Sequence, residues 1–227
     1  MQPNGPTIQA AIEHALTTAL REPARLRAAG RTDAGVHAFG QVATMPLERI
    51  PEDLGRLLRS LNALTPDDIS IRELSLVDDR FDPRRHARGR RYEYRVWRGP
   101  AASPFWRRWA WHVWAPLDVP AMQAAAAVLL GEHDVLGFQG PDADPHESTV
   151  RRISESGFVE DGPSLIYGIE ATAFLKNMVR NILGTLVEVG RGDRPVESIA
   201  DILASRDRTR AGKTAPPHGL ALVRVRY

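Results

Sequence analysis

Apolar residues recur every three or four positions in several stretches of the sequence, which is the pattern of an amphipathic helix. This spacing predicts helices over residues 8–20, 119–130, 174–189 and 195–204. A further helix is expected over residues 51–64, because its opening proline lies in the first turn and loses no backbone hydrogen bond there.

Two of these helices follow a residue that can cap them. Thr7 precedes the first, and Asp118 precedes the helix that begins at residue 119. Each side-chain oxygen can accept a hydrogen bond from a backbone N–H of the first turn, which predicts that the helices start at these residues.

Alternation of apolar and polar residues marks the predicted strands. In the clearest case Tyr92, Tyr94 and Val96 share one face, and charged residues occupy the other. Strands are expected over residues 36–45, 68–77, 90–97, 109–114, 150–159, 164–173 and 219–227. Because strands and helices mix without regular βαβ alternation, the sequence predicts the α+β class.

The composition limits the chemistry that the chain can carry. Its 227 residues are 43% apolar and 26% charged, as in an ordinary globular protein. No run approaches the roughly 18 apolar residues of a membrane span, and the N-terminal residues lack the pattern of a signal peptide, so a cytoplasmic protein is expected. The chain has no cysteine, which excludes disulfides, thiolate nucleophiles and cysteine-based zinc sites.

Arginine dominates the basic residues. Of 30 Lys and Arg residues only Lys176 and Lys213 are lysines, and ten arginines lie between Arg80 and Arg108, interleaved with aromatic side chains. Guanidinium groups match phosphate geometry, and aromatic rings stack on unpaired bases, so this pattern is typical of an RNA-binding surface. A solvated basic face explains the composition equally well.

The histidines form no metal-site pattern, since none of the seven belongs to an HxH or HExxH pair. The tetrapeptide "GEHD" at residues 131–134 fits the turn at the end of a helix better than a metal site. Phosphate-binding loops and nucleophile elbows are absent from the sequence, so no metal or cofactor is expected.

The stretch "GRTDAGVHA" at residues 30–38 places Asp33 between Arg31 and Gly35. A turn explains this order, because Asp bonds its own backbone and Gly adopts a positive φ. Alternatively, extended backbone would put the side chains of Arg31 and Asp33 on one face and hold the carboxylate beside a cation. Asp33 would then serve as a nucleophile or a charge stabiliser.

The predicted helix over residues 174–189 raises a similar question for Arg180. Apolar residues form a stripe along this helix, and Lys176 and Arg180 lie on the opposite flank. Two interpretations remain open: a solvated basic edge, or a cation directed at a carboxylate in a cleft.

Four long motifs occur in the chain in this order: "GRTDAGVHA", "FDPRRHARGRRYEY", "FLKNMVRNILGTLVEVGRG" and "AGKTAPPHGLALVRVRY". Together they resemble the tRNA pseudouridine synthase A family, over essentially the whole length of the chain. The resemblance implies an isomerase that converts uridine to pseudouridine at positions 38, 39 and 40 of the anticodon arm of tRNA. It also implies that the reaction needs no metal, nucleotide or redox cofactor.

The resemblance further implies the pseudouridine synthase fold, with two ferredoxin-like halves whose antiparallel or mixed sheets flank a central catalytic cleft. We place an N-terminal subdomain with the Asp33 loop at residues 1–80 and a C-terminal subdomain at residues 81–227. Family members work as homodimers that bind one tRNA across both subunits. A homodimer with tRNA as its partner is therefore expected, without a membrane or small-molecule partner.

Five residues match functional positions of the family. Asp33 corresponds to the catalytic aspartate, Arg180 to its basic partner, and Tyr92 to the active-site tyrosine near the uracil. Without the motif, Tyr92 would be interpreted as a core aromatic residue. Arg31 corresponds to the arginine that inserts into the RNA as the target uridine flips out, and Arg84 to a position that contacts RNA.

Family members usually carry a strand and a loop ahead of the segment that matches "PTIQAAIEHAL", and this sequence begins at Met1 within that region. Loss of a central strand would expose sheet edges, so an alternative function is a catalytically impaired RNA-binding protein of the same fold. A third alternative is a nucleoside or glycoside hydrolase that uses Asp33, although a second carboxylate with a clear acid role is absent.

Overall fold

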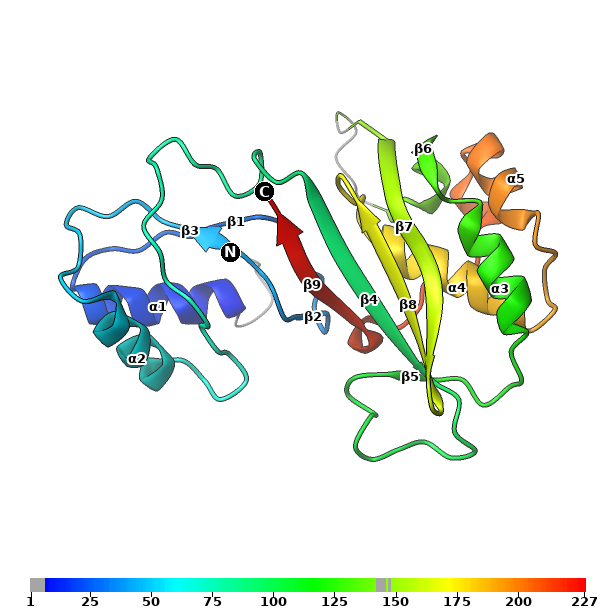
Figure 1. Cartoon of the computed structure of the whole chain (residues 1–227), viewed down its shortest axis with the longest axis horizontal. Helices are drawn as coiled ribbons and strands as arrows, with labels where there is room; N and C mark the ends of the chain where they lie inside the picture. Colours follow the sequence, from blue (N-terminus) through cyan, green and yellow to red (C-terminus); the bar gives the residue numbers. More distant parts are fainter. Residues whose placement is uncertain (1–6, 142–145, 147) are drawn as a thin grey trace. The chain divides into compact units, whose positions relative to one another are not determined.

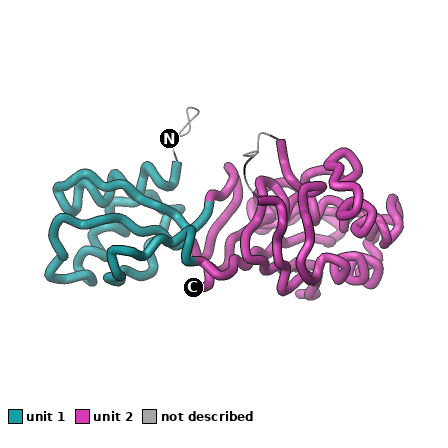
Figure 2. Tube along the Cα trace, turned by 90° about the horizontal axis from the view of Figure 1, so that it is seen from above, with its two compact units in different colours: residues 1–30, 42–86 teal, residues 31–41, 87–227 magenta. Residues whose placement is uncertain are grey.

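The structure is a computed structural model that describes residues 7–141, 146 and 148–227. Its chain divides into two compact units (Figure 2), one formed by residues 1–30 and 42–86 and the other by residues 31–41 and 87–227. The Asp33 loop therefore groups with the second unit. The boundary proposed from the sequence lies at residue 80 and assigns this loop to the first part.

The first unit contains two helices and a short strand pair. Helix α1 (Ile8–Leu20) begins where the sequence predicts, because Thr7 Oγ1 accepts a hydrogen bond from the Ala10 N–H at 3.1 Å. Strands β1 (Arg27–Ala28) and β3 (Ala43–Thr44) pair antiparallel in the same unit. The small core between these elements contains Ala15, Leu16, Ala24 and Leu61.

Helix α2 (Leu54–Leu64) starts later than the predicted position at Pro51. Asp53 caps it, with Oδ1 accepting from the Arg56 N–H at 2.8 Å. A side-chain carboxylate satisfies a free N–H of the first turn, which proline at residue 51 does not, so the cap sets the start of the helix.

The strand predicted over residues 68–77 is not formed among the described residues. Asn62 on α2 instead binds this segment: its Nδ2 donates to Ile71 O at 2.8 Å, and its Oδ1 accepts from Ile71 N at 2.8 Å. One side-chain amide thus takes both backbone groups that a neighbouring strand would use. Ile71 and Leu74 still pack on the core of the first unit, but they are three residues apart and so do not follow the alternation of a strand.

The single strand predicted over residues 36–45 is replaced by two short ones, β2 (His37–Ala38) in the second unit and β3 in the first. Gly40 lies between them, where the chain passes very close to strand β9 (Leu220–Arg226). A Cβ atom on Gly40 would lie 2.3 Å from Val223 O, so only glycine fits at this crossing.

The described residues of the second unit form a seven-stranded mixed sheet in the order β2, β9, β4, β8, β7, β6, with β5 paired to the end of β4 (Figure 1). Strands β2 and β9, and likewise β4 and β5, run parallel, and the other pairs are antiparallel. The remaining strands are β4 (Gly89–Trp97), β5 (Trp111–His112), β6 (Gly131–Asp134), β7 (Val150–Asp161) and β8 (Ser164–Ala171).

Three α-helices occur in the described part of this unit, and short 3₁₀ turns connect the elements. Helix α3 begins directly after Asp118, as predicted, and Asp118 Oδ1 accepts a hydrogen bond from the Ala121 N–H at 2.9 Å. The helices are α3 (Val119–Ala127), α4 (Met178–Gly190) and α5 (Ser198–Ser205), and the 3₁₀ turns are η1 (Leu136–Phe138), η2 (Arg208–Arg210) and η3 (Pro217–Gly219).

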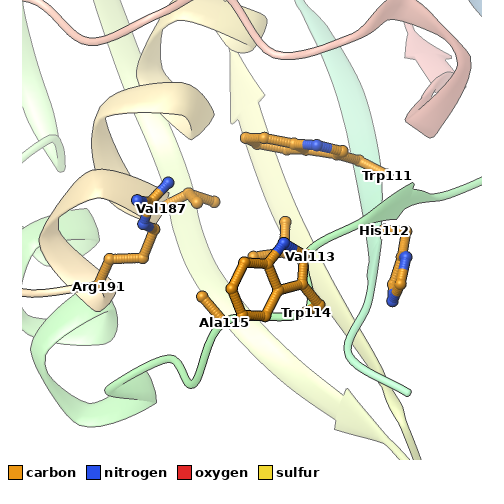
Figure 3. A pocket seen from close by; sticks show the side chains of 7 residues that line it. All are labelled: Trp111, His112, Val113, Trp114, Ala115, Val187 and Arg191. Carbon is orange, nitrogen blue, oxygen red and sulfur yellow. The ribbon is translucent and has the colours of Figure 1, made fainter. Parts of the chain in front are cut away.

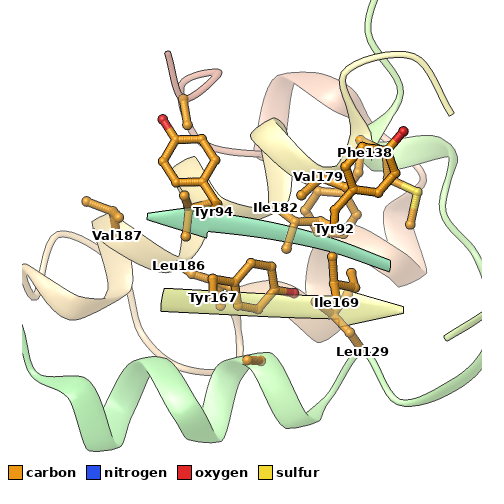
Figure 4. Packing of buried hydrophobic residues seen from close by; sticks show 14 of the residues in the cluster. Tyr92, Tyr94, Leu129, Phe138, Tyr167, Ile169, Val179, Ile182, Leu186 and Val187 are labelled. Atoms are coloured by element: carbon orange, nitrogen blue, oxygen red, sulfur yellow. The ribbon is translucent and has the colours of Figure 1, made fainter. Parts of the chain in front are cut away.

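Strand β4 has the predicted alternation, and this places the core of the second unit. Tyr94 and Val96 are fully buried and Tyr92 is 9% exposed, and all three belong to the core of this unit. Figure 4 shows Tyr92 and Tyr94 beside Val179 and Ile182 of α4. The apolar stripe predicted for residues 174–189 lies in this core too. Its buried members include Val179, Ile182 and Leu183.

Three sequence predictions for this unit need correction. "GEHD" forms strand β6, which pairs with β7, and is not a helix-terminal turn, because a neighbouring strand supplies hydrogen bonds that a local pattern cannot anticipate. The strand over residues 109–114 shortens to β5. Helix α4 begins at Met178 and not at residue 174, since Asn177 adopts a left-handed conformation with φ 59°.

The α+β class and the mixed sheet are confirmed. No α-helix among the described residues combines the length and apolar character needed to cross a membrane.

Candidate active site

Asp33 lies in a tight turn that leads into strand β2. The Val36 N–H donates to Asp33 O at 3.0 Å, and Gly35 has a φ of 80°. A Cβ on Gly35 would lie 3.1 Å from Pro217 Cγ, so both the conformation and the space favour glycine. The turn with a left-handed Gly35 is therefore confirmed, but the Asp33 side chain binds Arg180 and forms no bond to its own backbone in the described structure.

The Asp33 carboxylate forms an ion pair with Arg180 from helix α4. Asp33 Oδ2 accepts from Arg180 Nη1 at 3.0 Å, and the two side chains are 38% and 16% exposed. The other carboxylate oxygen, Oδ1, has no hydrogen-bond partner among the described residues. The pair is thus one-sided: one oxygen is held in place, and the other can face a substrate.

Arg180 is fixed by the protein at two further points. Its Nε donates to Ala215 O at 2.8 Å, and its Nη1 also donates to Asn177 Oδ1 at 3.1 Å. The Ala215 N–H donates in turn to Arg180 O at 3.1 Å, which ties the segment before η3 to the first turn of α4. Nη2 has no partner in the described part of the chain, so two N–H donors of the guanidinium group stay open.

Tyr92 approaches the same charges from strand β4. Its ring packs edge-on against Phe174 with the centroids 5.0 Å apart. The pKa of Tyr92 is raised to about 12, mainly by burial; the positive charge of Arg90 lowers it, and the negative charge of Asp33 contributes to the rise. The phenol is therefore neutral at physiological pH.

The hydroxyl group of Tyr92 differs from those of the other two buried tyrosines. Tyr94 donates to Pro216 O at 2.6 Å, and the Tyr167 hydroxyl bonds Ser156 Oγ at 2.8 Å. The Tyr92 hydroxyl has no such partner among the described residues. Tyr92 is 9% exposed, and its hydroxyl is not among the fully buried polar atoms that lack a partner in the described residues, so this hydroxyl is open to a partner from outside the chain.

The structure does not bring Arg31 and Asp33 into an ion pair. Arg31 is exposed and has no ion pair among the described residues, and the cation beside Asp33 is Arg180. Arg84 belongs to the first unit, where its backbone N–H donates to Asp82 Oδ1 at 2.8 Å. Four of the five residues predicted for the site thus lie in the second unit, and three of them interact there: Asp33 pairs with Arg180, and its charge acts on Tyr92.

Three of the ten arginines in the arginine-rich segment are seen to pair with carboxylates. Arg95 binds Asp161 at 3.0 Å, Arg98 binds Glu160 at 2.6 Å, and Arg91 pairs with Glu93 and Glu155. Arg107 and Arg108 are exposed and form no ion pair within the described residues. The number of arginines thus overstates the positive charge that this segment presents to a partner.

Sequence reasoning missed Asn177 and Ala215, which hold Arg180. The signal for Asn177 was weak, because an Asn just ahead of a predicted helix is usually only a cap. Ala215 contributes only backbone atoms, for which the sequence carries no signal.

Two cavities lie away from these residues. One of about 220 Å³ is lined by residues of the segment 111–115 together with Val187 and Arg191 (Figure 3). Another, of about 210 Å³, includes Trp106 and Trp109 in its lining. Neither contains Asp33, Arg180 or Tyr92.

Within the described residues, no group of three or more His, Asp or Glu side chains could hold a metal ion.

Comparison with known proteins identifies the class. A family model described as tRNA pseudouridine synthase matches residues 125–227. The tRNA pseudouridine synthase A of Myxococcus xanthus is 46% identical over 229 residues, which cover 100% of this chain and 85% of that protein. Those of Geotalea uraniireducens and Geobacter sulfurreducens are each 43% identical, with 100% of this chain and 92% of each relative covered.

The chain belongs to the tRNA pseudouridine synthase A family, a family of isomerases.

Proposed function

We propose that this protein converts uridine to pseudouridine at positions 38, 39 and 40 of the anticodon arm of tRNA, with Asp33 as the catalytic residue. The observation that carries this proposal is the one-sided ion pair, in which Arg180 holds Asp33 Oδ2 and leaves Oδ1 without a protein partner. The relatives named tRNA pseudouridine synthase A support the overall reaction.

The reaction is an isomerisation in which no atom is gained or lost. The N1–C1′ bond of the uridine breaks, the uracil rotates, and C5 bonds to C1′. The proton on C5 is then released, and N1 acquires a proton. Asp33 has three possible roles in this reaction: it adds to C1′, it stabilises the cationic sugar, or it removes a sugar proton to form a glycal. Each role needs a carboxylate oxygen that has no protein partner, and Asp33 Oδ1 has none among the described residues.

Arg180 supports Asp33 as an orienting group. Its guanidinium is held by Ala215 O and Asn177 Oδ1, so the Nη1–H that binds Asp33 has a defined direction. A carboxylate fixed through one oxygen retains little freedom, and this places Oδ1 reproducibly against C1′.

Tyr92 acts beside the uracil as a neutral phenol. Because burial raises its pKa to about 12, it donates or accepts a hydrogen bond and is not a phenolate base. Its hydroxyl, unpaired in the described structure, fits a role in guiding the proton that leaves C5.

The RNA partner requires base flipping, because C1′ and C5 cannot be reached within a stacked helix. We assign Arg31 to the space that the flipped uridine leaves and Arg84 to a contact with the RNA. Arg31 is exposed and close in sequence to Asp33, which suits this role. A homodimer that works in the cytoplasm completes the proposal.

The test uses an unmodified tRNA transcript and maps pseudouridine at positions 38 to 40 after incubation with the full chain. The wild type forms pseudouridine, and Asp33→Asn lowers the rate at least about 10³-fold, or about 4 kcal/mol of barrier. Asp161→Asn is the matched control, because it disrupts another Arg–Asp pair, with Arg95 at 3.0 Å, and leaves the rate within about twofold.

Three outcomes contradict the proposal. Pseudouridine formation by Asp33→Asn at the wild-type rate removes Asp33 from the mechanism. Binding of tRNA without turnover by the folded wild type supports the catalytically impaired alternative. Release of free uracil indicates a hydrolase.

A further inference from the structure

Arg180 Nη1 is shared between two acceptors, Asp33 Oδ2 at 3.0 Å and Asn177 Oδ1 at 3.1 Å. We propose that Asn177 is a positioning residue, which orients the Arg180 guanidinium so that it holds Asp33 with one oxygen free. This inference rests on the proposed function for its effect on turnover, but its structural part can be tested without it.

The guanidinium needs more than one anchor. Ala215 O fixes only the Nε–H, at 2.8 Å, and a planar group held at one point can still tilt. The bond to Asn177 Oδ1 fixes the guanidinium at a second point, Nη1. The two bonds together define the plane of the guanidinium without any contribution from Asp33. The remaining Nη1–H then points to Asp33.

The Asn177 side chain binds Arg180 and does not cap helix α4. It occupies the N-cap position of α4, where an Asn side chain ordinarily accepts from a backbone N–H of the first turn. Here it forms no side-chain cap bond, and its Oδ1 instead accepts from the side chain of Arg180, three residues further on. The amide is thus oriented toward the site and does not serve the helix end.

The backbone at Asn177 is matched to this orientation. Its φ of 59° and ψ of 3° are left-handed, a conformation that Asn adopts more readily than most residues with a side chain. Gly140 packs beside it and donates its N–H to Lys176 O at 2.7 Å, and a Cβ on Gly140 would lie 2.6 Å from Asn177 Nδ2. The absence of a side chain at residue 140 therefore leaves room for the amide.

The first variant is Asn177→Gly, which suits the left-handed backbone and removes only the carboxamide. We expect kcat on tRNA to fall about 10-fold, as for loss of a hydrogen bond to a charged group, with KM within about twofold and Tm unchanged or higher. Arg206→Gly is the matched control, since Arg206 is also left-handed with φ 56° and ends helix α5. Its kcat stays within about twofold of wild type.

The second variant is Asn177→Asp. It distinguishes a role of Asn177 in positioning Arg180 from a role in capping helix α4. Asp tolerates the left-handed region, caps helices as well as Asn does and is favourable at a helix N-terminus, so the fold is kept. Its carboxylate, however, competes with Asp33 for Arg180 Nη1. Positioning predicts a lower kcat at unchanged Tm, whereas a purely structural role predicts wild-type kcat.

A readout independent of activity is the NMR signal of the Arg180 Nε–H. We expect a protected, sharp signal in the wild type, and faster exchange with solvent in Asn177→Gly. Wild-type kcat in both Asn177 variants, or an unchanged Arg180 signal in Asn177→Gly, overturns the inference. Absence of pseudouridine formation by the wild type overturns the proposed function instead, and the signal still decides the role of Asn177.

Discussion

Helix α4 carries two clusters of polar side chains that differ in how completely the protein satisfies them. The first, at its N-terminal turn, comprises Asp33, Arg180 and Asn177, and leaves Asp33 Oδ1 and Arg180 Nη2 without partners among the described residues. The second begins at the next residue, Asn181, and continues along the helix to Thr185.

The second cluster is closed. Asn181 is fully buried: its Nδ2 donates to Phe138 O at 2.8 Å, and its Oδ1 accepts from Arg208 at 3.0 Å and from Thr214 at 2.7 Å. Thr185 Oγ1 donates to Asn181 O and accepts from the Gly212 N–H, both at 2.8 Å.

The difference between the clusters separates two uses of buried polar groups. Where every group has a protein partner, the network stabilises one arrangement of α4 against the segment 208–215. In the cluster around Asp33, polar groups beside a partly exposed carboxylate have no protein partner in the described structure. A substrate can supply the hydrogen bonds that these groups lack. Both clusters contact the same segment, through Ala215 in one and Gly212 and Thr214 in the other, so the closed cluster also supports the open one.

The largest effect is expected for Arg180→Lys in the open cluster. One ammonium group cannot reproduce the planar arrangement that serves Ala215 O, Asn177 Oδ1 and Asp33 together, so kcat on tRNA falls about 100-fold. Single-turnover kinetics measures this loss. The control is Arg208→Lys in the closed cluster, which lowers the free energy of unfolding and keeps kcat within about twofold. Equal kcat losses in the two variants would contradict the division into open and closed clusters.

The next effect concerns stability. Asn181→Ala leaves Phe138 O and the Arg208 guanidinium without their buried partner, so the free energy of unfolding falls by about 2 kcal/mol. Urea unfolding measures it, and kcat of the folded protein at 25 °C stays within about twofold. Asn177→Gly serves as the comparison, because there we expect the reverse: lower kcat and unchanged stability. A strong kcat loss in Asn181→Ala would show that the two clusters are not separable.

The smallest effect compares two tyrosines on one strand. Tyr94→Phe removes the bond to Pro216 O and lowers the free energy of unfolding by about 1 kcal/mol, with kcat retained. Tyr92→Phe removes a hydroxyl with no partner among the described residues, so stability is unchanged and kcat falls about 10-fold. Thermal unfolding and the tRNA assay together distinguish these results. A stability loss in Tyr92→Phe equal to that of Tyr94→Phe would mean that its hydroxyl serves the fold.

Much of the fold could be predicted from the sequence where a local signal exists. Thr7 and Asp118 set the starts of α1 and α3, and the alternation of β4 correctly buries Tyr94 and Val96. The predictions failed where a distant segment decides: Asn62 takes the hydrogen bonds of Ile71, and β7 converts "GEHD" into a strand. Residue types alone do not show that Asn62, nine residues before Ile71, binds its backbone, or that β7 pairs with residues 131–134.

The candidate site divides in the same way. Its motifs single out Asp33, Tyr92 and Arg180, but the local argument that paired Asp33 with Arg31 is wrong, because the neighbouring cation is 147 residues away in sequence. The hydrogen bonds from Arg180 to Asn177 and Ala215 were not predicted, since one depends on a left-handed backbone and the other on a main-chain carbonyl.

By itself, the sequence determined the α+β class, the caps at Thr7 and Asp118, the buried face of β4 and the family resemblance that matches Arg180 to the partner of Asp33, because these depend on residue types at short spacing or in long motifs. Only the tertiary structure decided how Arg180 is held, which oxygen of Asp33 stays open, and which of the hydroxyl groups of Tyr92, Tyr94 and Tyr167 has no partner among the described residues. Those outcomes depend on directions and distances between side chains from separate elements, which are set only when α4, β4 and the Asp33 loop pack together.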